Sequence, residues 1–455
     1  MAGSKVGKRA VVIGAGIGGL AAAQALTVSF DEVVVLEQDS LPAVPIPRTG
    51  VPQGRHPHGL LAGGLKALED LLPGFGRDLA QAGAVKLNPG YDVLFERLGQ
   101  GQSPRQRFEW HSYAMSRPLL ELTLRRRVEQ HRKITIRGGC RVMEILGASG
   151  SGIVIGVSYQ TRDRAPESTR TPTTLLADLV VDASAHGTLT LAFLKATGRA
   201  LPKETVIGME THYSSAVFSA PVAAGEFKIM LTYPKPPVQL RYGYLYAAEN
   251  NRWQVLLIGR GNDVPPFDGD GFLKYAQQIE PSSIYDAIKN ATRVGEITQF
   301  GFRESVWRHF GRLRDLPRGL LPIGDAICRL NPVYGQGMTV ALQEANMLQQ
   351  LLQLQSSEKD PLAKLGQTFL ANAELLIEDA WETSALPDLA YPETRGERPL
   401  DLEEKLRFRG AVSRIAARDA AFHELFSAIR HLLKPLKALE EPEILRRVQE
   451  EMAAV

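Results

Sequence analysis

The chain has 455 residues, of which 44% are hydrophobic and 23% are charged, as in ordinary globular proteins. This composition excludes a disordered or collagen-like protein, and two cysteines are too few for a disulfide framework. With 53 Lys and Arg against 50 Asp and Glu, the formal net charge is +3, so nucleic acid is not an expected partner.

The sequence has no stretch typical of a secretion signal or a membrane span. Glycines interrupt the apolar run that follows the first basic residues, and no run of about 18 apolar residues occurs. We therefore expect a soluble cytoplasmic protein, with weak contact to a membrane surface left open.

The first predicted elements are a strand over residues 9–13, a glycine-rich turn and a helix of good helix formers. In the turn, Gly14 would make the tight bend, Gly16 would let the backbone approach a pyrophosphate, and Gly19 would let the helix pack on the strand. A second strand ends in Glu37, where an acidic side chain can bind ribose hydroxyls. The spacing predicts a dinucleotide site without distinguishing FAD from NAD.

The next segment, residues 48–61, is rich in Gly, Pro and His and is predicted to be a loop that can cover a ligand. His56 and His58 are two residues apart, but no acidic or thiol partner follows at ligand spacing, so we do not expect a metal. The two histidines can act as proton carriers or as hydrogen-bonding residues of the loop.

Two further segments carry polar residues at the ends of regular elements. Residues 116–125 predict a helix with Ser116 as its N-cap and a proline in its first turn. Residues 177–184 predict a buried strand and turn that contains Asp182.

Near residue 320 an apolar strand ends in the polar turn Gly324-Asp325. A proline and two glycines then precede a helix predicted over residues 338–352. A helix N-terminus behind a glycine-rich loop favours negative charge, such as that of a reduced flavin.

The middle of the chain is rich in β-branched and aromatic residues. Residues 205–215, 227–233 and 242–261 predict strands of an antiparallel sheet, with a hairpin turn at residues 249–251. One face of such a sheet can shape a substrate pocket, and its candidate substrate contacts are Tyr213, Met230, Tyr242 and Tyr244. The alternative is that these four side chains belong to the core.

From about residue 360 the chain is predicted to be helical. Apolar residues from Ile415 to Leu436 repeat at the spacing of one last helix, accompanied by Arg414, Arg418 and Arg430. This basic amphipathic helix can pack on the body of the protein or lie on a membrane.

Residues 48–61 and 321–338, together with the glycine fingerprint, resemble FAD-dependent monooxygenases of the para-hydroxybenzoate hydroxylase type. Within that type they are most similar to the bacterial flavin epoxidases of polyether biosynthesis. The resemblance implies an α/β fold with three parts. These are a Rossmann-like FAD-binding domain of the glutathione-reductase-2 type (8–75, 112–200 and 315–355), an antiparallel β-sheet substrate-binding domain (76–111 and 201–314) and a helical C-terminal region (356–455).

The resemblance also assigns site residues. FAD would be bound by Gly14, Gly16, Gly19, Glu37, Arg48, Gln53, Arg117, Asp182, Gly324, Asp325, Gly335, Gln336, Gly337 and Met338. The candidate catalytic residues around the flavin ring are Pro332, Tyr334, Gly335, His58 and Arg48.

The chemistry implied is that reduced FAD adds dioxygen at C4a and transfers one oxygen atom to an alkene or aromatic ring of a lipophilic secondary metabolite. The sequence departs from relatives after Asp182, where Ala185-His186-Gly187 replaces a Gly-Arg-Gly turn. Electrons can therefore come from NAD(P)H directly or through a separate flavin reductase. The alternatives are a reductase of prenyl double bonds, a non-catalytic flavin-fold binding module and a flavin halogenase, whose Trp-x-Trp-x-Ile-Pro signature is absent.

Overall fold

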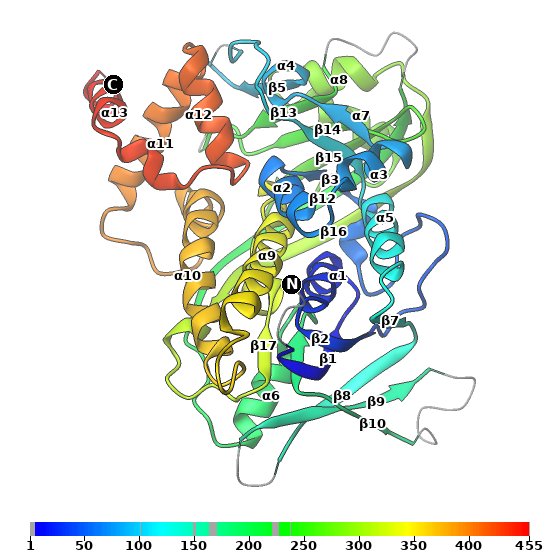
Figure 1. Cartoon of the computed structure of the whole chain (residues 1–455). Helices are drawn as coiled ribbons and strands as arrows, with labels where there is room; N and C mark the ends of the chain where they lie inside the picture. The colour runs from blue at the N-terminus through cyan, green and yellow to red at the C-terminus, as the bar shows by residue number, and fades with distance from the viewer. Residues whose placement is uncertain are drawn as a thin grey trace.

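A parallel sheet forms the centre of the computed structural model, which describes residues 5–100, 102–148, 152–162, 171–220, 227–236 and 238–454. The strand order is β17-β11-β1-β2-β7 (Figure 1). The strands are β1 (Gly7–Ile13), β2 (Phe30–Leu36), β7 (Ile134–Arg137), β11 (Leu179–Asp182) and β17 (Leu320–Pro322). Every neighbouring pair is parallel, as the α/β class requires.

Both faces of this sheet are covered, which explains the continuous buried apolar runs Ala10–Ile13 in β1 and Val33–Leu36 in β2. Ala10 and Val12 of β1 pack with helices, whereas Val11 and Ile13 pack with a second, antiparallel sheet. The helices on the first face include α1 (Ile17–Leu26), α5 (Arg117–Glu129) and α9 (Gly337–Gln355). The second sheet, at the bottom of Figure 1, consists of β8 (Cys140–Gly147), β9 (Val154–Thr161) and β10 (Thr173–Leu176).

A larger sheet of order β18-β16-β12-β15-β14-β13-β5 contains the strands predicted from the middle of the chain. Its pairs are antiparallel except β13 with β5, which is parallel. In the predicted hairpin turn, Asn250 and Asn251 have φ of 61° and 53°, as a type I′ turn needs. The strands are β5 (Val93–Arg97), β12 (Glu204–Ser219), β13 (Ile229–Tyr233), β14 (Tyr242–Ala248), β15 (Arg252–Arg260), β16 (Arg293–Arg308) and β18 (Cys328–Arg329).

A third, small sheet of order β3-β6-β4 belongs to the segments between the parallel sheet and the large sheet. Its strands are β3 (Pro57–Leu60), β4 (Val85–Leu87) and β6 (Ser112–Ser116). The remaining helices of this part are α2 (Ala62–Leu71), α3 (Phe75–Gln81), α4 (Pro89–Asp92), α6 (Thr188–Ala196), α7 (Gly269–Gln277) and α8 (Ser283–Ile288). The structure therefore confirms the predicted α/β class, whereas the domain boundaries stay a prediction.

The C-terminal region is helical, but the prediction of one last helix from Ile415 to Leu436 is wrong. The helices are α10 (Leu365–Ser384), α11 (Leu402–Ala416), α12 (Ala420–Arg430) and α13 (Pro442–Ala453), drawn in orange and red in Figure 1. A break separates α11 from α12, because the Asp419 carboxylate accepts a hydrogen bond from Phe422 N at 2.8 Å and begins a new helix.

Apolar residues of α11, α12 and α13 pack against one another, and those of α10 pack against the body of the protein. Arg414 and Arg418 both pair with Glu451 of α13. In the described part of the chain, no helix combines the length and the apolar character needed to cross a bilayer.

Candidate functional site

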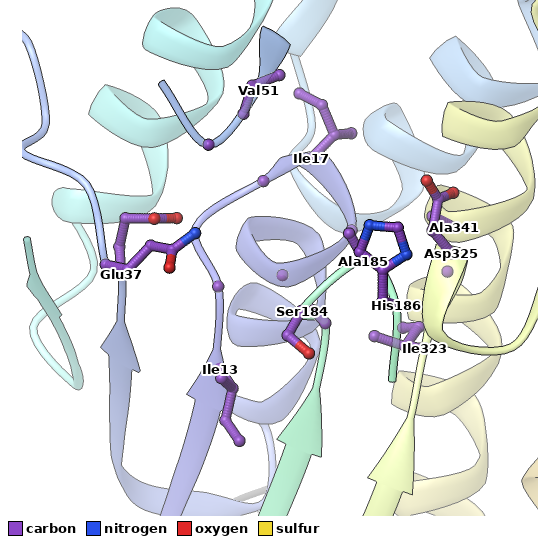
Figure 2. Close-up of a pocket in the computed structure, with 18 of the residues that line it drawn as sticks. Ile13, Ile17, Glu37, Val51, Ser184, Ala185, His186, Ile323, Asp325 and Ala341 are labelled. Carbon is purple, nitrogen blue, oxygen red and sulfur yellow. The ribbon is translucent and has the colours of Figure 1, made fainter. Parts of the chain in front are cut away.

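A cavity of about 650 Å³ lies at the carboxyl ends of the parallel strands. Figure 2 shows Glu37 just after β2, Ser184 and His186 just after β11, and Asp325 just after β17. In open α/β sheets this edge is where ligands bind, because the loops that follow the strands converge there.

The glycine turn after β1 has the geometry of a pyrophosphate site. Gly14 has φ of 99°, and a Cβ on Gly19 would lie 2.0 Å from the Gly14 carbonyl oxygen, so both positions require glycine. Gly16 faces open space, because no heavy atom of the described residues lies within 4 Å of the position of a Cβ. Helix α1 begins at once and has no side-chain cap, so its first N–H groups remain free to bind an anion.

Glu37 and Arg48 belong to one buried ionic network beside this turn. The Glu37 carboxylate accepts a hydrogen bond from Ala15 N at 2.8 Å and lies 3.1 Å from Arg48 Nη1. Arg48 also pairs with Asp39, at 3.1 Å, and donates from Nε to Glu121 at 2.5 Å. The network fixes Glu37 at the rim of the cavity, and three carboxylates hold the Arg48 guanidinium.

Arg117 lines the same cavity from the first residue of α5. The Ser116 hydroxyl accepts a hydrogen bond from Leu119 N at 3.3 Å, as the predicted N-cap should. Arg117 Nη1 lies 3.0 Å from Glu121 Oε2, yet it makes no hydrogen bond of good geometry with any residue in the described ranges. Burial lowers the pKa of Arg117, and Nη1 is a buried donor available to a ligand.

The opposite wall is the segment between β17 and α9. Asp325 lines the cavity, and its carboxylate accepts no hydrogen bond from any described residue. Burial raises the pKa of Asp325 to about 6, although Arg329 and Arg117 act in the opposite direction. Gly335 has φ of 74° and open space around it, so backbone and a flat ligand can approach closely here.

Glu344 of α9 lies behind this wall and accepts a hydrogen bond from Gly324 N at 2.6 Å. Burial raises its pKa from 4.5 to about 8, so the folded chain holds a proton there that the unfolded chain releases above pH 4.5. Stability contributed by this group is therefore complete below pH 4.5 and is lost as the pH rises to about 8.

The isosteric variant Glu344→Gln does not titrate. We expect its thermal unfolding midpoint to be nearest that of the parent at pH 5, to exceed it increasingly up to pH 8, and then to keep a constant difference. Differential scanning fluorimetry from pH 5 to 9 measures this, with the exposed Glu358→Gln as control. A difference that does not change with pH would contradict the buried proton.

Beside the cavity, His56 is buried and His58 is half-buried, and both are neutral at ordinary pH. Burial lowers the pKa of His58 to about 3 and that of His56 to about 4. His58 Nδ1 lies 2.8 Å from the His56 carbonyl oxygen, which can only accept, so Nδ1 carries the hydrogen and Nε2 is left as an acceptor. His56 Nδ1 bonds to the Ser215 hydroxyl at 2.6 Å.

The structure brings most of the predicted site residues together. The cavity is lined by Gly14, Gly16, Gly19, Glu37, Arg48, Gln53, His58, Arg117, Gly324, Asp325, Pro332, Gly335, Gly337 and Met338.

Three other predicted residues, Asp182, Gln336 and Tyr334, do not line the cavity but lie in the segments that form it. The Asp182 carboxylate is fully buried and accepts hydrogen bonds from Ser184 and Thr190. Gln336 bonds to Thr383 of α10, and the hydroxyl of Tyr334 bonds to Asp388.

The candidate substrate residues do not line this cavity. Met230 packs in the core between the large sheet and helices α7 and α8. Tyr213, Tyr242 and Tyr244 lie in a second cluster on the other face of the large sheet, and the Tyr213 hydroxyl donates to Asn331 Oδ1 at 2.8 Å.

At the turn after β11, the structure shows an arginine that the sequence did not predict. No arginine lies close after Ala185 in the sequence, but Arg329 of β18 reaches this turn and donates from Nη1 to His186 Nδ1 at 3.2 Å. Ala185 has φ of 66°, which strains a residue with a Cβ. The position of Arg329 depends on the pairing of β18 with β16 and has no local sequence signal.

Sequence reasoning also missed a buried polar cluster beneath Pro332. The Asp388 carboxylate is fully buried and accepts from Arg260 at 2.6 Å, from Asn331 at 3.1 Å and from Tyr334 at 3.0 Å. The cluster ties the start of the cavity wall to the large sheet and to the C-terminal region. Its members come from three distant segments, so no spacing in the sequence could reveal it.

Comparison with known proteins shows the family to which the chain belongs. No model of a known protein family matches the sequence. Protein Rv3254 of Mycobacterium tuberculosis (strain ATCC 25618 / H37Rv) is 32% identical over 407 residues, which are 85% of this chain and 81% of the relative. The chain belongs to the family of Protein Rv3254.

Solved structures show the fold that this Rv3254-family chain shares with other proteins. The flavin-dependent brominase Bmp2 is 16% identical, with a TM-score of 0.66 and coverage of 98% of each chain. A flavoprotein/dehydrogenase from Cytophaga hutchinsonii is 13% identical, with a TM-score of 0.67, covering 98% of this chain and 99% of the other. p-Nitrophenol 4-monooxygenase PnpA from Pseudomonas putida DLL-E4 is 14% identical, with a TM-score of 0.63, and the match covers 93% of this chain and 98% of the other.

At these identities the likeness establishes the fold alone. The Rv3254-family chain has the architecture of flavin-dependent halogenases and monooxygenases, and the residues of its own cavity must carry any statement about its function.

Proposed function

We propose that the chain is an FAD-dependent monooxygenase. The observation that carries the proposal is one cavity with a dinucleotide turn at Gly14–Gly19 and the glycine-rich Gly324–Met338 wall opposite it. Three features fit FAD: the empty space over Gly16, the uncapped start of α1 and the donor Nη1 of Arg117. The flavin-dependent proteins of the same fold support the proposal.

Different residues of the cavity would bind different parts of FAD. Gly16 and the first turn of α1 would bind the pyrophosphate, and Glu37 would accept from the ribose of the adenosine half. The Asp325 carboxylate, which has no other donor among the described residues, would accept hydrogen bonds from the ribityl hydroxyls. The segment from Pro332 to Met338 would contact the flavin ring.

When bound and reduced, FAD supplies two electrons to dioxygen, so that one oxygen atom enters the substrate and the other leaves as water. The chain positions and shields this chemistry. Free N–H groups in the first turn of α9, which starts at Gly337, would favour negative charge on a flavin ring bound beside them. Apolar residues such as Ile17 and Met338 restrict water in the cavity. His58 Nε2 is a neutral acceptor that can take a proton or hydrogen bond.

The finer assignment is epoxidation or hydroxylation of a lipophilic or aromatic metabolite, with a slight preference for epoxidation. Epoxidation needs no protein base on the substrate, and no nucleophile triad or carboxylate pair stands out in the sequence. Electrons would come from NAD(P)H directly or through a flavin reductase. The Ala185–Gly187 turn lacks the arginine that the resemblance implies there, and Arg329, which donates to His186, would take its place in either route.

Rapid mixing tests the proposal. Purified protein loaded with FAD is reduced chemically in the absence of oxygen and mixed with oxygenated buffer in a stopped-flow spectrometer. We expect a transient absorbance band that belongs to neither reduced nor oxidised flavin. A direct return to oxidised flavin, with no transient and no oxygenated product from an alkene and aromatic panel, would overturn the proposal.

Two additional arms of the experiment refine it. Anaerobic mixing with NADPH and with NADH shows whether the chain takes electrons directly, and failure of both supports a partner reductase. Added bromide or chloride tests the activity of the halogenases that share the fold, and halogenated product would replace the monooxygenase assignment.

A further inference from the structure

Three arginines gather where the large sheet meets the C-terminal helices. Arg97 ends β5, Arg409 lies in α11, and Arg430 ends α12. Figure 1 shows α12 beside the β13 and β5 edge of the sheet. The three side chains are half-buried, and no carboxylate in the described ranges forms an ion pair with any of them, although the buried arginines of the chain have such a partner.

The partners of the three arginines are neutral. Arg430 Nη2 donates to the Tyr233 hydroxyl, and its guanidinium carbon lies 4.8 Å from the centre of the Tyr233 ring. Arg97 lies 6.0 Å from the same ring, and its Nε is a buried donor that has no hydrogen-bond partner among the described residues. Arg409 donates to the Thr383 carbonyl oxygen at 3.0 Å. The cluster therefore has three positive charges and unused donor capacity.

The energetics of this arrangement favour an added anion. Burial lowers the pKa of Arg97, and Arg430 lowers it further. Burial also lowers the pKa of Arg409 to about 10, with Arg430 and Arg97 contributing in the same direction. Charges removed from water without a counter-ion are destabilising, so a protein retains such a group where a ligand supplies the opposite charge.

The three-arginine cluster, Arg97, Arg409 and Arg430, adjoins the wall that would contact the flavin. Tyr334, next to Gly335 of the cavity lining, interacts electrostatically with Arg409. Gln336 Nε2 lies 3.5 Å from the Arg430 carbonyl oxygen. On the other side, the Tyr246 ring lies 3.1 Å from the Cβ position of Gly59, one residue after His58. The cluster is thus next to both loops of the cavity.

We infer that the substrate carries an anionic oxygen group, a carboxylate or a phosphate, which the three-arginine cluster binds, and that its oxidisable part points toward the flavin. This inference rests on the proposed function. Tyr233, Tyr244 and Tyr246 supply aromatic surface and hydroxyl donors around the anion. The C-terminal helices thereby complete the substrate site, which requires Arg409 and Arg430.

Binding of matched probes tests the inference on the full-length, FAD-loaded protein. The probes are benzoate, 2-naphthoate and octanoate, each beside its neutral primary amide, and phenyl phosphate as the second anion class. Binding is followed by the change in flavin absorbance and by thermal shift. We expect one or more anions to bind at least about 10-fold tighter than the paired neutral compound, as one charged hydrogen bond provides.

The variants Arg97→Met and Arg409→Met should each weaken anion binding at least about 10-fold and change binding of the amides less than about 2-fold. Removing one of three unpaired charges should also leave the thermal midpoint without probe equal to or above that of the parent. Arg407→Met, an exposed residue of the same helix, is the control and should bind like the parent.

Carboxylate binding without phenyl phosphate binding identifies a carboxylic acid substrate, and the reverse identifies a phosphate ester. No preference for anions across the panel, or unchanged anion binding in both variants, would overturn the inference. Flavin absorbance separates the two levels: a chain that holds FAD but shows no anion preference refutes only the anionic substrate, whereas a chain that holds no FAD refutes the proposed function.

Discussion

Replacing Gly16 with valine is expected to abolish FAD binding and to leave the fold intact. Gly16 has φ of −73° and ψ of −179°, an extended conformation that valine adopts easily. A Cβ there would meet no protein atom within 4 Å, so the added side chain fills only the space assigned to the pyrophosphate. We expect FAD affinity to fall by at least about 100-fold, or about 3 kcal/mol.

Fluorescence titration of the flavin-free protein measures this loss, and thermal unfolding without FAD measures the fold. Gly301→Val is the matched control, because Gly301 also has open space around its Cβ position but is exposed on β16, where valine is favourable. Retention of parental FAD affinity by Gly16→Val would show that the dinucleotide does not lie on this turn.

The largest loss of stability is expected from Asp388→Ala. The Arg260 and Asp388 side chains are 4% and 0% exposed, so the variant leaves the Arg260 charge buried and unpaired, and Asn331 and Tyr334 lose their acceptor. Breaking a buried pair of this kind costs about 3–5 kcal/mol. Urea unfolding of the flavin-free chain should show a clearly lower midpoint.

A double variant separates the ion pair from general damage. Arg260→Leu combined with Asp388→Leu removes both charges and should lose less stability than the sum of the two single changes. Asp31→Ala, which breaks the exposed pair with Lys5, should change stability by no more than about 0.5 kcal/mol. Additive losses at Arg260 and Asp388 would contradict a coupled buried pair.

The sequence could predict those parts of the site whose geometry depends only on residues close together in the chain. The tight turn, the close approach and the helix start of Gly14–Gly19 all depend on neighbouring residues, and the same is true of the Ser116 cap and of the turn at Asp325. Local steric and capping rules are therefore sufficient to predict the part of the cavity that we propose binds the cofactor.

The region that we propose binds the substrate could not be predicted in this way. Arg97 and Arg430 are brought together only by packing of the C-terminal helices on the large sheet, and alternation along β14 could not show which layer covers Tyr244. The break before α12 did have a local signal, the cap at Asp419, but a continuous apolar periodicity concealed it.

The most direct test of the account is the cofactor of the purified chain. Protein incubated with FAD, desalted and then denatured should release about one FAD per chain, identified by mass and by absorbance. Gly16→Val prepared in parallel should release almost none. A well-folded parent chain that retains no flavin after incubation with excess FAD would contradict the central claim that this cavity is a flavin site.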